Sequence, residues 1–560
     1  MSALRRLKSD RHFSKRKQCL ALLMLVSGTV WAATEPTLSK GALQIIRHLA
    51  IQHNGRHKPF DSFAREAVQS ITGISRVGHE DPLVTVLAIL ADPERWQAEP
   101  LISVPFVPMR EALGMNPKAT HISYNDLLAT RKLMRLLPAI VEKQERSEKL
   151  SMLDNETMDV FQRFVTLSAL FEQRLELVPP PPGALSGDWL PILQPSGYPD
   201  DQQATLRSAW QNFVTTLHDR SPQAIDTSAS QLTSLLRAAN PAAYSAPWRL
   251  RLEVFYNQAR PFQLARMFYA LAALVLAVGL IGARHRVLAA GSGMVWIGFA
   301  IHGAGILMRV VLGGRPPVSN FFETMLWLPF VAVALSLIFE QVYRVGYFGL
   351  ASALLASITL LIADYVPLDS SISPVVAVLH SNLWLTVHVL TIVASYGALA
   401  LATMLAHVYG TLYLTRRGVH PALASLDIFL YRTIQVGVVL LAGGIMLGAV
   451  WANASWGRYW GWDPKETWAL ITLLWFLAVL HGRFAGWIQG VGLALATIGG
   501  FFLLLMTYYG VSFYLVGLHS YAGGHAKPLP LLLIGYLLAE VAFLFLVGTS
   551  VLFRKRLPQD

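Results

Sequence analysis

One short stretch concentrates residues that could hold a ligand: Ser455–Leu470, with the sequence SWGRYWGWDPKETWAL. It lies between two long apolar segments and contains four tryptophans: Trp456, Trp460, Trp462 and Trp468. Tryptophan favours the interface between membrane and water, so anchoring in lipid is one interpretation. So much aromatic surface in so few residues favours a second interpretation, which is a flat aromatic shelf for a flat, apolar and partly charged ligand.

The second half of this stretch predicts the start of a helix. Asp463 is placed as the N-cap, Pro464 as the first helical residue and Glu466 as the third residue of a capping box. Asp463 is therefore expected first as a cap, although its place in the stretch also makes it a candidate contact of the ligand.

The composition of the whole chain indicates a membrane protein. Its 560 residues are 54% hydrophobic and 14% charged, and the apolar residues are concentrated after about residue 262. We expect an all-α polytopic membrane domain over 263–560, preceded by a mostly helical extracytoplasmic domain over 33–262. The net charge of +12 does not indicate nucleic-acid binding, because seven of the basic residues crowd the first 17 positions and many others flank predicted spans.

The first 32 residues have a basic start, an apolar run from Leu20 to Val30 and a small residue at Ala32. This pattern predicts a secretory signal peptide, with an uncleaved anchor as the alternative. The single cysteine, Cys19, lies in this segment. The rest of the chain can therefore form no disulfide and no thiolate metal site, and it contains no CxxCH motif.

Nine apolar segments are long enough to cross a membrane, at approximately 263–283, 287–312, 321–342, 345–366, 384–408, 431–453, 467–484, 487–510 and 529–553. If the chain starts outside, an odd number of spans ends inside. Most lysines and arginines beside the spans then fall on the cytoplasmic side. The exceptions are Arg315, Arg458, Lys465 and Lys527. This asymmetry predicts that the tryptophan-rich stretch lies on the outer face.

The segment WGRYWGWDPKETW, residues 456–468, resembles the WWD signature of the haem-handling proteins of cytochrome c maturation, which include the CcsA/ResC type, CcmC and CcmF. The resemblance implies presentation of haem on the outer face of the membrane. The span count and the long exported domain favour the CcsA type, because CcmC-like proteins are much shorter and CcmF-like proteins have more spans. A weaker resemblance, over residues 48–66, is to the segment ahead of the membrane part in some fused cytochrome c synthases.

His388 and His519 fall beside the predicted outer surface, on either side of the tryptophan-rich stretch in sequence. Taken alone, they could be two unrelated interfacial histidines. They match the two external histidines of the family, which implies that they ligate haem iron at an outer site and supply both axial ligands. The haem contacts implied at this site are Trp456, Trp460, Trp462, Asp463 and Trp468.

His481 lies 17 residues beyond Pro464, so its imidazole is expected roughly 25 Å deeper along a helix, near the cytoplasmic end of the seventh span. It cannot bind the same iron as the outer pair. It matches the transmembrane histidine of the family, which implies an inner haem site, and solvation beside Arg483 is the alternative. The family pairs this histidine with a second one that can belong to a ResB/CcsB-type companion, and His302 is the candidate within this chain.

A further family phrase covers Arg309–Thr324, RVVLGGRPPVSNFFET. It resembles an arginine followed by a loop of Gly and Pro, then Ser-Asn, two aromatic residues and Glu. Arg309 and Arg315 could bind haem propionates, because a guanidinium pairs bidentately with a carboxylate. A structural turn in which Ser319 or Asn320 caps the next helix explains the loop equally well.

The resemblance implies that haem b, bound non-covalently and in transit, is presented for covalent attachment to the CxxCH motif of apocytochrome c. The chain would be a component of a cytochrome c synthase (haem lyase) in the bacterial inner membrane, with its N-terminal domain and the WWD loop in the periplasm. The expected partners are apocytochrome c, a ResB/CcsB-type membrane protein, thiol-reducing proteins and membrane lipid, and no nucleic acid. Two alternatives stay open: a haem exporter without attachment chemistry, and a b-type haem electron-transfer subunit.

Overall fold

The computed structural model of the protein describes residues 39–146, 148, 150–184, 187–219, 221–365, 368–374, 382–416, 418–519 and 530–556. The predicted signal segment, with Cys19, lies outside the described residues, and so does Lys527. Contacts between residues divide the chain into two compact units. The domain boundary expected near residue 262 stays a prediction.

The first unit contains the residues up to Leu49 together with Phe63–Lys132 and Val160–Tyr244. Its helices are α2 (Lys40–Arg47), most of α3 (Phe60–Thr72), α4 (Pro82–Ala91), α5 (Pro93–Gln97), α6 (Val107–Leu113), α7 (Tyr124–Thr130), part of α9 (Met152–Phe171), α10 (Asp200–Asp219) and α11 (Pro222–Ala239). Two short antiparallel strand pairs accompany them: β3 (Ile102–Ser103) with β4 (His121–Ile122), and β5 (Glu176–Val178) with β6 (Leu190–Pro191). Helix α10 packs on α11 and α4, and its Trp210 and Phe213 are buried.

The second unit contains Ala50–Ser62, Leu133–Asp159 and the chain from Ser245 onward. It includes helix α8 (Lys132–Glu145) and an antiparallel hairpin, β1 (Ala50–His53) and β2 (Arg56–Pro59), in which Ala50 faces Pro59. Its other α-helices are α12 (Pro247–Ala259), α13 (Pro261–Gly282), α14 (His285–Gly313), α15 (Phe321–Tyr343), α16 (Tyr347–Tyr365), α17 (Asn382–Trp384), α18 (Leu390–Thr415), α19 (Ala422–Trp456), α20 (Pro464–Phe484), α21 (Val491–Leu505), α22 (Val511–Tyr514) and α23 (Leu531–Arg556). Two π-helical turns join this bundle, η2 (Leu385–Val389) ahead of α18 and η3 (Met506–Gly510) between α21 and α22.

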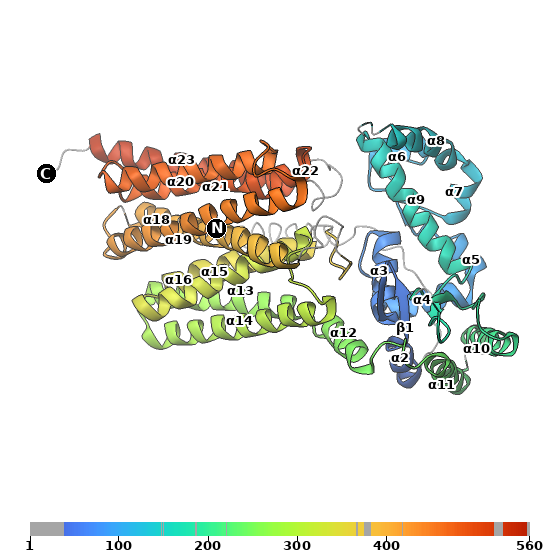
Figure 1. Ribbon diagram of the computed structural model, residues 1–560. Coiled ribbons are helices and arrows are strands. Elements are labelled where there is room, and N and C mark those ends of the chain that lie inside the picture. The colour runs from blue at the N-terminus through green and yellow to red at the C-terminus, as the bar shows by residue number, and fades with distance from the viewer. Residues whose placement is uncertain are drawn as a thin grey trace, which may run out of the picture. The chain divides into compact units, whose positions relative to one another are not determined.

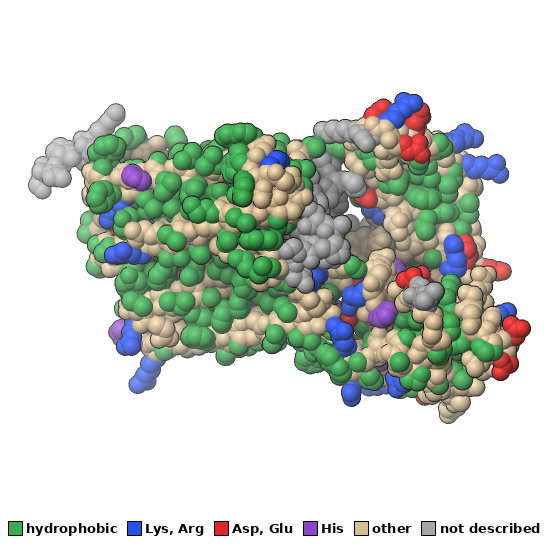
Figure 2. All heavy atoms as spheres, viewed as in Figure 1, with side chains coloured by type: hydrophobic (Ala, Val, Ile, Leu, Met, Phe, Trp, Pro, Cys, Tyr) green, Lys and Arg blue, Asp and Glu red, His purple; other side chains and the backbone are tan. Residues whose placement is uncertain are grey.

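Within the described residues, nine helical segments are long and apolar enough to cross a membrane. The prediction of an all-α polytopic membrane protein with nine spans is therefore confirmed. Figure 1 shows these helices running side by side in one bundle. On the face seen in Figure 2, the sides of the bundle are mostly hydrophobic, and its Lys, Arg and His side chains lie mainly toward the ends. This distribution suits a bundle whose sides meet lipid, where charged groups are costly.

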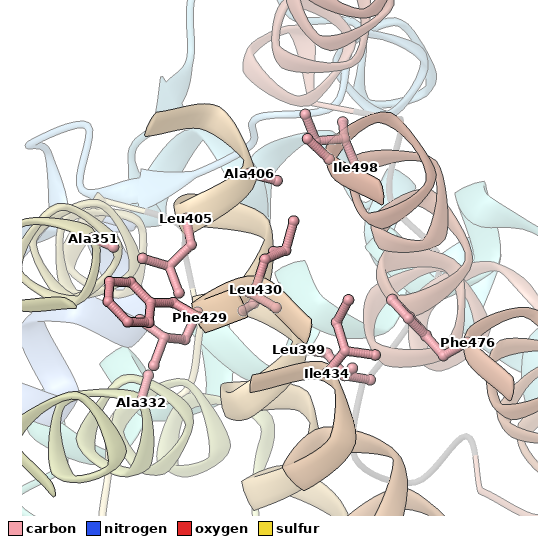
Figure 3. Packing of buried hydrophobic residues seen from close by; sticks show 14 of the residues in the cluster. Ala332, Ala351, Leu399, Leu405, Ala406, Phe429, Leu430, Ile434, Phe476 and Ile498 are labelled. Carbon is pink, nitrogen blue, oxygen red and sulfur yellow. The ribbon is translucent and has the colours of Figure 1, made fainter. Parts of the chain in front are cut away.

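Helix α18 forms the centre of the bundle and packs against α15, α16, α19 and α21. Figure 3 shows its leucine and alanine side chains meeting apolar residues from these neighbours. The approach to α15 is so close that a β-carbon at Gly397 would lie 2.6 Å from the Leu328 carbonyl oxygen. Small residues allow helix backbones to approach in this way, which is how helices associate in a membrane.

Three pairs of ionisable side chains join helices of the bundle to one another. Arg266 on α13 binds Asp364 on α16, and Arg483 on α20 binds Asp427 on α19. His407 on α18 lies 2.9 Å from the Glu540 carboxylate on α23. Pairing lowers the cost of placing these groups at membrane depth, so each pair fixes two helices to each other.

A buried cluster of charge joins α14 to the first turn of α15. Glu323 accepts from the guanidinium groups of Arg309 and Arg315, at 2.9 Å and 2.7 Å. Arg309 also donates to Tyr256 and to two carbonyl groups of the segment after α16, and Arg315 donates to a third, that of Ser373. Asn320 caps α15 by accepting from the Glu323 amide at 2.8 Å, as one of the two predicted caps.

Candidate binding site

A cavity opens in the bundle next to the tryptophan-rich stretch, and both outer histidines line it. Its walls come from η2 and the start of α18, the end of α19, the start of α20, the start of α15 and the turns η3 and α22. The lining is mostly apolar and aromatic, and its polar or hydroxyl-bearing residues are Ser319, Asn320, Thr324, His388, Tyr396, Tyr459, Lys465, Glu466, Tyr508, Ser512 and His519. An apolar cavity with a few polar groups is the usual form of a small-molecule site.

His388 belongs to the π-helical turn η2. Its Nδ1 donates to the Gly444 carbonyl oxygen at 2.9 Å, and its ring lies 5.5 Å from that of Trp451. Because Nδ1 carries the proton in this hydrogen bond, the lone pair of the neutral ring is on Nε2. One turn further along α19, a β-carbon at Gly448 would lie 2.7 Å from Cε1 of His388, so the absence of a side chain there makes room for the imidazole.

His519 is held by the residue that caps α20. Its Nδ1 donates to the Asp463 carboxylate at 2.7 Å. The same carboxylate accepts from the Leu518 amide at 2.6 Å and from the Lys465 amide at 3.2 Å. Burial alone would raise the pKa of Asp463, but the hydrogen bonds from His519 and from these amides outweigh it and hold that pKa below its usual value. Asp463 is therefore ionised at neutral pH and fixes the orientation of His519.

The predicted capping box is confirmed in full. Asp463 accepts from the amide of Lys465, Pro464 is the first residue of α20, and the Glu466 carboxylate accepts from the Asp463 amide at 3.1 Å. Glu466 also accepts from the Gly461 amide at 2.8 Å, so it closes the loop before the helix as well. The sequence pattern identified the cap, but it gave no sign that Asp463 binds a histidine 56 residues further on.

Trp451 connects the two histidines. It is 2% exposed, and its ring lies 5.5 Å from His388 and 6.4 Å from His519. It precedes the tryptophan-rich stretch by one helical turn and was absent from the predicted site. A single tryptophan inside a long apolar span carries no signal of its own, and only the packing of α19 against η2 brings it between the two imidazoles.

The four predicted tryptophans take different places. Trp456 packs edge-on against His519 at 5.2 Å, and Trp460 lines the cavity. Trp462 is 70% exposed and meets Trp460 edge-to-face at 5.7 Å, with a backbone φ of 56° that places it in the left-handed region. Trp468 lies on α20 and is not among the described lining residues. The structure therefore places two of the four against the histidines and the cavity rather than all four in one flat shelf.

The remaining predicted site residues lie away from this cavity. His481 is exposed near the end of α20, where its Nδ1 donates to the Leu477 carbonyl oxygen at 2.7 Å. His302 is fully buried on α14 among the rings of Phe262 and Phe330, each 5.5 Å away. Arg309 is engaged by Glu323 and is not among the described lining residues. Their roles toward haem stay predictions.

The region that builds the cavity matches a known protein family. Residues 318–519 match the family model described as Cytochrome C assembly protein. These bounds coincide with Val318 and His519, the first and last residues of the described lining. The matched region therefore contains the whole described wall of the cavity.

Several known proteins are similar to this chain. Protein NrfI of Wolinella succinogenes is 31% identical over 519 residues, which cover 88% of this chain and 55% of that protein. Cytochrome c biogenesis protein CcsA of Prochlorococcus marinus is 35% identical over 246 residues, which cover 39% of this chain and 78% of that protein. The CcsA protein of Chlamydomonas reinhardtii is 34% identical over 226 residues, covering 39% and 64%. The chain thus spans about half the length of NrfI and most of the Prochlorococcus CcsA protein.

Proposed function

Because the chain belongs to the CcsA type of cytochrome c biogenesis proteins, we propose that its membrane unit holds haem between His388 and His519 and presents it for covalent attachment to apocytochrome c. The haem is a substrate in transit, haem b, and it is held without a covalent bond. The observation that carries the proposal is that the two histidines line one cavity while an oxygen atom holds Nδ1 of each.

The hydrogen bonds of the two imidazoles suit iron ligation. A histidine that binds a metal usually donates its other ring N–H to a carbonyl or carboxylate, which fixes the tautomer and raises the basicity of the ligating nitrogen. Here the Gly444 carbonyl serves His388 and the Asp463 carboxylate serves His519. Two such nitrogens would supply both axial positions of a low-spin haem.

The proposal gives the protein a positioning role in the attachment reaction. Each cysteine of a CxxCH segment adds across one vinyl group of haem: the S–H bond breaks, a C–S bond forms at one vinyl carbon, and the proton ends on the other. The addition consumes no electrons. The histidine of CxxCH then replaces one of the two axial imidazoles, which lets the product leave. The catalytic contribution of this chain is to hold haem and peptide in register.

The supply of haem and the partners are part of the same proposal. We place the outer cavity on the periplasmic side of the bacterial inner membrane, because most basic residues beside the spans fall at the other side. Haem would enter from the side of His481, near the opposite end of α20 from Asp463. A ResB/CcsB-type partner would complete the inner site, and thiol-reducing proteins would keep the cysteines of CxxCH reduced.

Removal of either imidazole tests the site. Purified His388→Ala and His519→Ala proteins should each lose most of the low-spin spectrum of reduced haem, and added imidazole should restore it by filling the vacant axial position. His285→Ala, which removes an exposed histidine at the start of α14, serves as the matched control and should keep the spectrum. A low-spin signal that is indifferent to both outer changes would contradict the proposal.

Co-expression with a CxxCH reporter separates the proposed activity from its rivals. An attachment protein should increase covalent haem on the reporter, and both histidine variants should reduce that yield. A haem exporter would leave covalent attachment unchanged while moving haem across the membrane. A b-type electron-transfer subunit would keep its haem permanently and would not pass it to the reporter.

Filling the space beside His388 provides a second test of the site. Gly448→Val should push the imidazole out of place, because even a β-carbon at this position would meet the ring at 2.7 Å. We expect affinity for haem to fall about tenfold or more, as it does when a ligating histidine loses its orientation. The measurement is titration of the apoprotein with haem, followed by absorbance.

Gly443→Val provides the control on the same helix. A β-carbon at Gly443 would meet nothing within 4 Å among the described residues, so this variant should bind haem as the unchanged protein does. Equal affinity in the two valine variants would show that Gly448 does not set the position of His388.

A further inference from the structure

A lysine side chain enters the cavity that holds the two histidines. Lys465 lies in the first turn of α20 and is one of the lining residues. Its Nζ donates to the Ser512 hydroxyl at 2.9 Å and to the Tyr508 carbonyl oxygen at 3.3 Å. Both acceptors are neutral. An ammonium group has three N–H donors, so these two hydrogen bonds account for only part of its capacity.

The carboxylates near Lys465 are engaged by other groups. Asp463 attracts the lysine through space, but its oxygens accept from His519 and from backbone amides. Glu466 accepts from the amides of Gly461 and Asp463 and lies 3.5 Å from Arg458. Among the residues that the structure describes, no carboxylate oxygen lies within ion-pair distance, 4.0 Å, of Lys465 Nζ.

An unmatched ammonium group in an apolar cavity is costly. Removing a charge from water is unfavourable unless an opposite charge replaces the lost hydration. The positive end of the α20 dipole lies at the same place and adds to the demand for an anion. A ligand that brings a carboxylate to Lys465 would stabilise the ammonium group and would also interact favourably with the α20 dipole.

We propose that Lys465 binds a propionate carboxylate of haem in the outer cavity, an inference that rests on the function proposed above. Haem carries its propionates and its vinyl groups on different edges of the ring. Fixing a propionate at the start of α20 would therefore hold the vinyl edge away from Lys465, where a CxxCH segment could reach it. In this arrangement the two histidines fix the position of the haem iron. Lys465 fixes how the porphyrin is rotated about the axis that joins the two imidazoles.

The structure favours Lys465 over Arg309 and Arg315, the two arginines that the sequence suggested for this role. Arg309 and Arg315 share Glu323 and donate to backbone carbonyls after α16. Neither belongs to the described lining of the cavity. Lys465 lies on the cavity wall together with both histidines, so one ligand could contact all three.

A pair of ligands tests the inference in binding experiments. The purified apoprotein is titrated with haem and with haem dimethyl ester, in which both propionates are blocked as neutral esters. The unchanged protein should bind haem about tenfold more tightly than the ester. This is the gain in affinity expected from one hydrogen bond between the Lys465 ammonium and a propionate carboxylate. Lys465→Met should bind haem and the dimethyl ester with equal affinity. Its affinity for the ester should equal that of the unchanged protein. Lys465→Arg should restore much of the preference, and Arg432→Met, which removes a cation on α19 outside the described cavity lining, should keep it.

The outcomes separate this inference from the proposed function. If Lys465→Met keeps the full preference for haem over its ester while the His388→Ala and His519→Ala proteins lose low-spin haem, the role of Lys465 is overturned and the proposed function stands. If the haem spectrum is indifferent to both histidine changes, the proposed function fails and the role of Lys465 fails with it. Thermal unfolding of the ligand-free variants checks that each one is folded before titration.

Discussion

Replacing Asp463 by alanine should weaken haem binding about 10-fold to 100-fold, which is the usual cost of removing the group that orients a ligating histidine. The carboxylate is the acceptor for His519 Nδ1 and for the Leu518 amide, so its loss releases the ring and the chain next to it. The same change removes the N-cap of α20, at a cost of about 1 kcal/mol of stability. Titration with haem measures the first effect and thermal unfolding measures the second.

Asp463→Asn separates the two roles. Asparagine caps helices as well as aspartate does, so the stability of α20 should be kept. Its amide oxygen can still accept from His519 but carries no charge, and haem affinity should fall between those of the unchanged protein and Asp463→Ala. A variant Asp463→Asn as weak as Asp463→Ala would mean that the charge, and not the orientation of the ring, is what matters.

The lowered pKa of Asp463 also determines the pH range in which acid weakens the site. A carboxyl group whose pKa in the folded protein lies below its ordinary value contributes stability that is fully present above that ordinary value. This contribution is lost as the pH falls through the lower, folded pKa. The hold on His519 should therefore be unaffected by pH changes near neutrality.

Glu323→Ala should be the most destabilising single change in the bundle, by about 3–5 kcal/mol, because it leaves two buried guanidinium groups without their shared carboxylate. The side chains of Arg309 and Glu323 are 1% and 2% exposed, and that of Arg315 is 8% exposed. The loss should appear as a lower midpoint of thermal unfolding in detergent, measured on the ligand-free protein.

The pair between Arg266 and Asp364 gives the comparison for this prediction. Its side chains are 21% and 20% exposed, and Asp364→Ala leaves one guanidinium group without its carboxylate instead of two, so this change should cost less than Glu323→Ala. If Glu323→Ala were no less stable than Asp364→Ala, the buried cluster would not be what holds the start of α15 to α14.

The membrane helices were predictable because their signal is local. A run of about 20 apolar residues is sufficient to indicate a span, and the cap at Asp463 follows a pattern of four adjacent positions. The ends of spans were less certain. The first span was expected from residue 263, but α12 precedes α13 with only the left-handed Arg260 between them, so the helical segment begins at Pro247.

The inner arrangement of the site was not predictable from local patterns. The histidines were found through a resemblance, and the contacts that hold them come from Gly444 and Asp463, which lie 56 residues away in each case. Trp451 and Lys465 gave no signal, because one tryptophan in a span and one lysine beside a helix start are ordinary. Only the packing of η2, α19 and α20 brings these residues to one cavity.

The two π-helical turns limit the changes in chain length that the cavity can tolerate. Both contribute to the cavity wall, η2 through His388 and η3 through Tyr508. A π-helical turn accommodates one residue more than an α-helical turn, and each residue of an α-helix advances the side chains by about 100°. Deleting a single amino acid from η2 would therefore turn the His388 imidazole to another side of the helix, although His388 itself would still be present. The spacing of the chain, as much as its composition, is under constraint at this wall.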